Sequence, residues 1–392
     1  MKKIIRITIG LVIISMLAAC ESIYPATTQP TSTAAVIVKV VTNTPETATQ
    51  ALPTVTNAPT DTAVPTATTV PSATTAPTAA PTALGTLPDD SMSNYLDDRS
   101  TPAALILSYV NAINRHEYLR AYSYWPNPAS YLGTLSNFTN AMSNVSSESI
   151  SMGQVTSEGA AGSVFYTVPT AVTDTLTPSG TNKYAICFIL QFPQPANYGA
   201  PPIQPMNFAQ YTKTAVSTST SDASAISSAC SGSNTSGLPG TDAVVENLND
   251  LSVNNFIDNR SGAIEVISSL LNAINHKEYV RAYSYWQNPA TTVGSYASYA
   301  AGYNDTGSVT AIFGTVTSDA GAGQFHYQVP LAMKVITTSN TQQTFVGCYT
   351  LHLSNPGFQG TLPFEPLGIT AGKFTLVSNS ANLAPLIAAA CN

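Results

Sequence analysis

The sequence NAINHKEYVRAYSYW at residues 272–286 has a close copy, NAINRHEYLRAYSYW, at residues 111–125. The copies are 161 residues apart in a chain of 392 residues. Around them, residues 99–129 and 260–290 share 19 of 31 positions, and the same offset continues without an insertion as far as the last cysteines of the chain. An offset that persists through loops predicts the tandem duplication of a whole domain.

The repeat also sets the domain boundaries. Each copy has about 136 residues, which is enough for a hydrophobic core of its own, and the period is far too long for a solenoid repeat. A stretch that opens with SGSNTSGLPGTDA has the composition of a linker. We therefore expect a signal peptide at 1–20, a tether at 21–94, a first domain at 95–230, a linker at 231–255 and a second domain at 256–392.

The N-terminus predicts export and a lipid anchor. The cationic start MKKIIR precedes an apolar run of 13 residues, which is too short to cross ~30 Å of hydrocarbon and has the pattern of a signal-peptide core. The run ends in LAAC at residues 17–20, which resembles the lipobox of bacterial lipoproteins. The resemblance implies acylation of Cys20 by palmitate or a similar chain, and more than one acyl chain gives stable anchoring. The alternative is an ordinary signal peptide in which the cysteine is incidental.

The next segment has the composition of a disordered spacer. Residues 25–90 contain 10 Pro and 20 Thr and no aromatic residue, so they cannot bury enough apolar surface to offset their ordering entropy. Frequent proline favours an extended chain with a reach on the order of 200 Å. We expect the chain to be held at the extracytoplasmic face of the cell membrane by its lipid, with this tether lifting the domains away from the surface.

The overall composition narrows the classes of partner. Only 9% of residues are charged and the net charge is −7, with no basic cluster, which argues against nucleic acid. The sequence contains no phosphate-binding loop, nucleophile elbow or metal-ligand cluster, so we expect no cofactor and no metal. The membrane, through the lipid, is one partner, and cell-wall, glycan, peptide or small apolar ligands are the candidate classes for the others.

The cysteine spacing predicts two disulfides. Apart from Cys20 there are four cysteines, two per unit, with the same internal separation of 43 residues. An exported compartment permits disulfides, and equal spacing in both copies favours bridges within each unit over crossed ones. We predict the pairs Cys187–Cys230 and Cys348–Cys391.

Each unit is predicted to begin with helices and to continue with strands. Thr101 suits a helix N-cap and Pro102 suits the first helical position, and apolar residues recur at helical spacing as far as residue 113. A second short helix carries the aromatic residues and ends before Asn127–Pro128, and a weaker helical pattern follows at 135–145. The period then changes to two, which predicts a hairpin and two further strands in the stretches ISMGQVTS, SVFYTVPTAV, KYAICFILQF and FAQYTKTAVS. This order predicts an α+β fold, with helices on one face of a curved antiparallel sheet.

A helix containing NAIN, a short polar turn, EY, and an aromatic second helix ending in Trp resemble the start of the nuclear transport factor 2-like superfamily. The stretch YAAGYNDTGSVTAIFGTV, followed by a long hairpin, is similar as well. The resemblance implies two cone-shaped domains, each with about three helices wrapped by a bent sheet and a pocket at the wide end. The superfamily includes isomerases, dehydratases and many non-catalytic extracytoplasmic domains, and its enzymes place a His, Asp or Glu inside the cone.

The candidate binding residues are aromatic. Most of the repeated aromatic residues must be core residues at helical spacing, but some are candidates for a pocket or a surface, where Tyr and Trp suit carbohydrate or peptide stacking. His326 is predicted to lie in a strand, pointing either into a pocket or outward. The candidates are Tyr124, Trp125, Tyr285, Trp286 and His326.

Recurring charges are expected to have structural roles. Asp97, Glu117, Glu158, Arg99 and Arg120 each have a counterpart of the same charge 161 residues later. Glu117 precedes a helix, where the helix dipole favours a carboxylate. We expect the arginines to form ion pairs with either Asp97 or Glu117, or with their counterparts Asp258 or Glu278, rather than to bind a substrate, and we name no catalytic residue.

The leading functional hypothesis is a non-enzymatic binding or scaffolding module outside the cytoplasmic membrane. Two alternatives remain open, namely an isomerase-type or dehydratase-type enzyme that uses the cone pocket, with His326 or a Tyr hydroxyl as the acid–base group, and a passive cell-wall spacer. A deep cavity with a buried carboxylate or His favours the enzyme. A filled cone with an exposed aromatic patch favours binding, and a filled cone without one favours the spacer.

Overall fold

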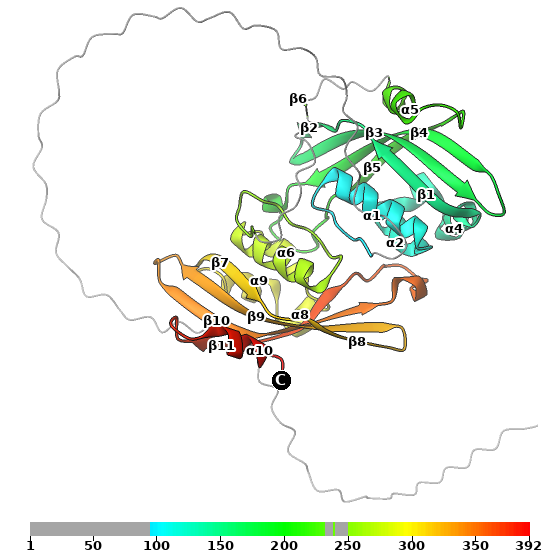
Figure 1. Cartoon of the computed structure of the whole chain (residues 1–392). Helices are drawn as coiled ribbons and strands as arrows, with labels where there is room; N and C mark the ends of the chain where they lie inside the picture. Colours follow the sequence, from blue (N-terminus) through cyan, green and yellow to red (C-terminus); the bar gives the residue numbers. More distant parts are fainter. Residues whose placement is uncertain (1–94, 232–237, 240–249) are drawn as a thin grey trace, which may run out of the picture. The chain divides into compact units, whose positions relative to one another are not determined.

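The computed structural model describes residues 95–231, 238–239 and 250–392. The predicted signal peptide, Cys20 and the Thr/Pro-rich tether lie outside the described residues, as does most of the predicted linker. The described part confirms the α+β class: two repeated units each pack helices against an antiparallel sheet that does not close into a barrel (Figure 1). No helix in this part of the chain is long and apolar enough to cross a membrane.

In the described part of the first unit, four helices precede the sheet and one lies between its last two strands in the chain. They are α1 (Pro102–Asn114), α2 (Tyr118–Ser123), α3 (Pro128–Leu132), α4 (Leu135–Met142) and α5 (Asp222–Ala229). The strands are β1 (Val145–Met152), β2 (Thr156–Ala160), β3 (Ser163–Leu176), β4 (Thr181–Pro193), β5 (Asn207–Val216) and the short β6 (Leu238–Pro239), with a 3-10 turn η1 (Pro195–Asn197) after β4. Thr101 caps α1 as predicted, because its side chain accepts a hydrogen bond from the backbone N–H of Ala104.

The second unit repeats this order. Its helices are α6 (Ala263–Asn275), α7 (Tyr279–Ser284), α8 (Pro289–Thr292), α9 (Tyr296–Ala301) and α10 (Leu383–Ala388). Its strands are β7 (Thr306–Phe313), β8 (Thr317–Gly321), β9 (Gln324–Thr337), β10 (Gln342–Ser354) and β11 (Gly368–Val377), with a 3-10 turn η2 (Pro356–Phe358) after β10. The sequence predicted about three helices per unit, and the structure adds a very short one and a C-terminal one to each.

The sheets share one topology. In the first unit the order is β5-β4-β3-β2-β6, and β1 also pairs with β3, beyond the stretch that β2 occupies. In the second unit the order is β11-β10-β9-β7, and β8 pairs with β9. The register shifts between Ile189 and Leu190 and, 161 residues later, between Thr350 and Leu351. A bulge of this kind bends a strand and increases its twist, so both sheets curve at the same place.

A glycine separates strands that the sequence pattern predicted as one. The stretch ISMGQVTS forms the end of β1 and the start of β2, with Gly153 between them. A Cβ on Gly153 would lie 2.5 Å from Cγ2 of Ile226 in α5, and a Cβ on Gly314 would lie 2.5 Å from Cγ2 of Ile387 in α10. Only glycine allows the C-terminal helix to approach this closely.

The C-terminal helices cover the outer face of each sheet, opposite the N-terminal helices (Figure 1). The two predicted disulfides are confirmed and attach these helices to the sheet: Cys187–Cys230 joins β4 to the end of α5, and Cys348–Cys391 joins β10 to the residues after α10. The inner face of each sheet packs on the first two helices of its unit and forms the main core there.

The N-terminal segments of the two units, which precede their first helices, pair with each other by reciprocal contacts. The backbone N–H of Arg99 donates to the carbonyl of Asp258 at 2.8 Å, and that of Arg260 donates to the carbonyl of Asp97 at 2.7 Å. Asp98 and Asn259 form an antiparallel bridge. Each of these backbone contacts is thus returned by the residue 161 positions away, as in the interface of a symmetric dimer.

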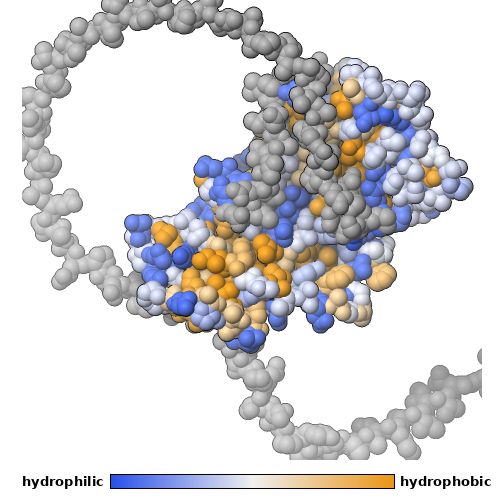
Figure 2. All heavy atoms as spheres, in the orientation of Figure 1, coloured by the Kyte–Doolittle hydropathy of each residue, from blue (hydrophilic) through white to orange (hydrophobic). Residues whose placement is uncertain are grey.

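Apolar surface is unevenly distributed. Figure 2 shows apolar atoms gathered over the region where Figure 1 places β7, β9 and β10. Large apolar side chains are exposed in both the strands and the loops of the second unit, including Ile312 at 45%, Leu376 at 59% and Phe358 at 80%. Isolated exposed apolar residues are ordinary in soluble domains.

Candidate functional site

Each unit contains a buried network centred on an arginine. Arg120 is 0% exposed and its Nε donates to Oε2 of Glu117 at 2.6 Å. Its Nη1 donates to the hydroxyl of Tyr124 at 3.1 Å, and that hydroxyl donates to Oδ1 of Asp97 at 3.1 Å. The guanidinium of Arg99 lies over the Tyr124 ring, 4.6 Å from its centroid. The second unit repeats these contacts with Glu278, Arg281, Tyr285, Asp258 and Arg260.

This network is structural in both units. Burial raises the pKa of Tyr124, and the charge of Asp97 raises it further, so the phenol keeps its proton and acts as a donor. The predicted ion pairs between Glu117 and Arg120 and between Glu278 and Arg281 are confirmed. Glu117 makes no side-chain capping bond to α2, because its carboxylate is used by the buried arginine instead.

The four aromatic candidates lie inside the units. Tyr124 and Tyr285 are 0% exposed and belong to the networks above. Trp125 is buried and stacks on Phe208, with ring centroids 4.9 Å apart, and Trp286 is buried in the core of the second unit. The indole Nε1 atoms of Trp125 and Trp286 have no hydrogen-bond partner among the described residues. None of the four rings forms an exposed stacking surface.

The histidines are peripheral. His326 occupies an exposed position of β9 directly opposite His352 of β10, with ring centroids 4.9 Å apart. Of the two orientations considered for His326, the structure shows the outward one. His116 is exposed and His276 is half-buried in the turns after α1 and α6. Within the described ranges, no group of three or more His, Cys, Asp or Glu side chains is placed to hold a metal ion.

The inner face of the first sheet carries a polar cluster. Glu148 of β1 and Asp174 of β3 are directly opposite each other, and cross-strand partners lie on the same face of a sheet. Val172, two residues before Asp174, belongs to the main core, so this face is the inner one. Tyr184 of β4 and Lys213 of β5 lie nearby, with Nζ of Lys213 3.6 Å from the centroid of the Tyr184 ring.

Asp174 is the buried member of this cluster. It is 4% exposed, and its Oδ1 has no hydrogen-bond partner among the described residues. Burial raises the pKa of Asp174, and the charge of Lys213 offsets part of that rise. Burial also raises the pKa of Tyr109, and the carboxylates of Glu148 and Asp174 raise it further, which places the Tyr109 hydroxyl beside them.

The second unit has an apolar surface at the same positions. The residues 161 positions beyond Tyr109, Glu148, Asp174, Tyr184 and Lys213 are Leu270, Val309, Val335, Phe345 and Phe374. Leu270 and Val309 are buried in the second core, and Val335 and Phe374 pack against it. The polar cluster is therefore a property of the first unit alone, placed on a scaffold that both units share.

Sequence reasoning missed this cluster because it looked for charges that recur. Glu148 and Asp174 do not recur, and nothing in the local sequence says that they face each other across two strands. The signal that was present is the difference between the copies: three charged positions of the first unit are apolar in the second.

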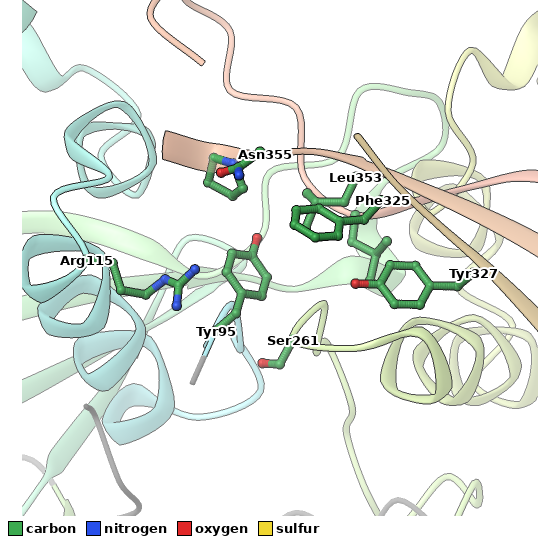
Figure 3. A pocket seen from close by; sticks show the side chains of 9 residues that line it. Tyr95, Arg115, Ser261, Phe325, Tyr327, Leu353 and Asn355 are labelled. Atoms are coloured by element: carbon green, nitrogen blue, oxygen red, sulfur yellow. The ribbon is translucent and has the colours of Figure 1, made fainter. Parts of the chain in front are cut away.

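A cavity of about 130 Å³ lies beside Arg115 (Figure 3). We call it the Arg115 cavity, and its lining includes Tyr95, Arg115, Ser261, Phe325, Tyr327 and Leu353. Figure 3 shows Arg115 and Tyr95 on one side and Phe325 and Leu353 together on the other. The pocket implied by the family resemblance would lie inside one cone, whereas this cavity takes its lining from both units.

Comparison of the chain with protein-family models, with curated proteins and with solved structures found no match. The resemblance to the nuclear transport factor 2-like superfamily therefore remains a prediction from short sequence motifs.

Proposed function

We propose that this protein is a lipid-anchored, extracytoplasmic binding module whose first unit binds a small ligand that carries an ammonium group. The second unit serves as its structural partner. We also propose that each unit is a cone of the nuclear transport factor 2-like type. The sequence motifs and the curved sheet with helices on its inner face support that assignment, and the two disulfides indicate an extracytoplasmic protein.

The observation that carries the proposal is the buried Oδ1 of Asp174, which has no hydrogen-bond partner within the described part of the chain. A buried polar group without a hydrogen bond costs on the order of 1–3 kcal/mol, and the second unit shows that the scaffold folds with valine at this position. A feature that costs stability and that the fold does not require is best explained by function.

The chemistry of the cluster favours a cationic ligand. Two carboxylates and the hydroxyl groups of tyrosines offer hydrogen-bond acceptors, and aromatic rings attract cations through their faces. The chain already places its own ammonium, that of Lys213, over the ring of Tyr184. Lys213 is exposed and can leave this position, so an ammonium ligand would compete with it for the same ring.

An acid–base enzyme is the second candidate, because burial raises the pKa of Asp174 and a carboxyl group with a raised pKa is a common general acid or base. No residue of the cluster is arranged as a nucleophile beside a base. We therefore place binding first, and the enzyme candidate predicts the same dependence on Asp174 together with turnover of the ligand.

The test uses benzylamine as the ligand and benzyl alcohol as its uncharged match, titrated calorimetrically into the full-length chain. Benzylamine should bind at least about tenfold more tightly than benzyl alcohol, the equivalent of one charge-assisted hydrogen bond. Asp174→Asn should remove this preference, and Lys213→Met should strengthen benzylamine binding because the competing ammonium is gone. Asp319→Asn, at an exposed position of β8, is the matched control and should have no effect.

Equal affinity for the alcohol and the amine would refute an ammonium site. So would a Lys213→Met variant that binds benzylamine more weakly, since that result would make Lys213 a part of the site rather than a competitor. Unfolding curves for each variant show whether a lost affinity reflects a lost fold.

A further inference from the structure

Two histidines of the second unit form a pair across neighbouring strands. His326 of β9 and His352 of β10 are directly opposite each other, and their ring centroids are 4.9 Å apart. Leu351 and Leu353, on either side of His352, belong to the main core of this unit, so the two histidines lie on the outer face of the sheet. His326 is exposed there, and a solute can therefore reach the pair without entering the core.

The first unit has the same register without the histidines. The residues 161 positions before His326 and His352 are Phe165 and Gln191, and these two are directly opposite each other in β3 and β4. The shared fold therefore does not require histidine at either position. The two histidines are 26 positions apart in the chain, so no local spacing in the sequence indicates a metal site.

A glutamine fixes the position of the proton on His352. Nε2 of Gln287 donates to the backbone carbonyl of His352 at 3.0 Å, which turns Oε1 of the same amide toward Nδ1 of the ring, at 3.1 Å. Nδ1 therefore carries the proton, and the lone pair of the neutral imidazole is on Nε2. Histidine ligands of metal ions are commonly oriented in this way, with the second ring N–H donated to an oxygen.

The side-chain amide of Gln324 lies at the lone pair of His352. Oε1 of Gln324 contacts Nε2 of His352 and also accepts from the hydroxyl of Ser354 at 3.0 Å. The contact between Nε2 and Oε1 thus joins two acceptors. It is relieved by a proton, by rotation of the Gln324 amide, or by a cation held beside both atoms.

Two acidic residues lie near the pair. Asp319 of β8 is directly opposite His326, so both side chains belong to the outer face. Burial lowers the pKa of His352, the charge of His326 lowers it further, and the charge of Glu365 opposes both. The neutral imidazole, which is the form that binds metal ions, is therefore favoured over the protonated one. The carboxylates of Asp319 and Glu365 balance part of the charge of a cation bound at the pair.

We propose that His326 and His352 form a surface site for a divalent transition-metal ion, with copper(II) bound most tightly. Imidazole nitrogens suit zinc, copper and nickel, and the Irving–Williams order places copper(II) first. A metal ion holds each imidazole nitrogen at about 2.0–2.1 Å, which two rings 4.9 Å apart allow after small rotations of the side chains. Solvent completes the coordination, so we expect a lower affinity than that of sites with three or four protein ligands. This site does not rest on the function proposed for the first unit.

The test titrates copper(II) chloride calorimetrically into the full-length chain, with Cys20→Ser in every protein because a free thiol would bind the metal. Copper should bind, and an excess of magnesium, which prefers oxygen ligands, should not compete. His326→Phe and His352→Gln introduce the residues of the first unit and should each weaken copper binding at least about tenfold. His116→Gln, at an exposed histidine of the first unit, is the matched control and should leave the affinity unchanged.

Three results would overturn the proposal: no copper binding by the folded parent chain, competition by magnesium, or copper binding that is unchanged in either His326→Phe or His352→Gln. Both variants carry residues that the same fold accepts in the first unit, and unfolding curves show that each is folded. Failure of this site is distinct from failure of the ammonium site. Asp174→Asn should change only the response to benzylamine, and His352→Gln should change only the response to copper.

Discussion

The two units have the same skeleton and different inner faces. Both bury an arginine, a glutamate, a tyrosine and an aspartate in the same network, and both close the same disulfide. On the inner face of the sheet, however, the first unit has Glu148, Asp174 and Lys213 where the second has Val309, Val335 and Phe374. What recurs in this molecule holds the fold together, and what differs marks the place where we propose that one copy acquired a binding site.

The shared arginines should have the largest effect. Arg120→Met and Arg281→Met each remove the buried guanidinium that pairs with a buried glutamate, and breaking a buried ion pair in this way costs about 3–5 kcal/mol. Arg120 also donates to the carbonyls of Leu96 and Ser108, so we expect the upper end of that range. Urea unfolding followed by circular dichroism measures the loss. A much smaller loss for Arg281→Met than for Arg120→Met would show that the two networks are not equivalent.

Loss of the disulfides should have the second-largest effect on stability. Each closes a loop with a sequence separation of 43, for which the chain-entropy model gives ~4 kcal/mol. Replacing either pair by alanine should therefore destabilise the protein by a similar amount, and mild reduction of the wild type should combine both losses. Thermal unfolding of the two double variants, compared side by side, tests whether the bridges contribute equally.

The third prediction concerns a variant of the second unit that carries a carboxylate of the first unit at the corresponding position. Val309→Glu introduces a carboxylate at a position that is 4% exposed and is surrounded by apolar residues. We expect a loss of about 3 kcal/mol, the lower end of the cost of an uncompensated buried charge. The reverse change, Glu148→Val, should be close to neutral or stabilising. If Val309→Glu were harmless, the apolar inner face of the second unit would not need to be apolar.

The smallest expected effect depends on pH. Burial raises the pKa of Asp174, so the folded chain holds this proton more tightly than the unfolded chain does. The group's contribution to stability is therefore greatest below the ordinary pKa of aspartate and is lost as the pH rises through the raised value. Asp174→Asn does not titrate and should be more stable than the wild type at neutral pH by on the order of 1 kcal/mol.

At acid pH the difference between Asp174→Asn and the wild type should disappear, because the protonated carboxyl group and the amide are close in shape and charge. Urea midpoints measured across the acid-to-neutral range give this comparison directly. A difference that stays constant with pH would mean that Asp174 does not titrate differently in the folded chain.

The sequence predicted the shared fold well because the two copies can be compared position by position. A residue that recurs at a fixed offset has a role that both copies need, which is why the disulfides and a structural ion pair of Arg120 were predicted. The helix cap at Thr101, whose counterpart is Gly262, was predicted from local residue preference instead. The α+β class followed from the change of period along each unit. The helices α5 and α10 were missed because they are short and carry weak apolar patterns.

Comparison of the two copies could not predict the candidate sites, and the reasons are physical. Glu148 and Asp174 are 26 positions apart, and only the register of β1 on β3 brings them together. The Arg115 cavity takes its lining from segments that are far apart in the chain. Burial, too, cannot be read from residue type: Tyr124 and Trp125 were candidates for a surface because Tyr and Trp suit stacking, yet their neighbours enclose them.

The reciprocal pairing of residues 97–99 with 258–260 has an evolutionary consequence. In an assembly of two identical chains, every substitution appears twice, so an ionic pocket in one partner forces the same pocket on the other. Joining both halves in one polypeptide removes that constraint while it fixes their ratio at one to one. Within one chain, one unit is free to specialise, and the other can be selected for stability alone.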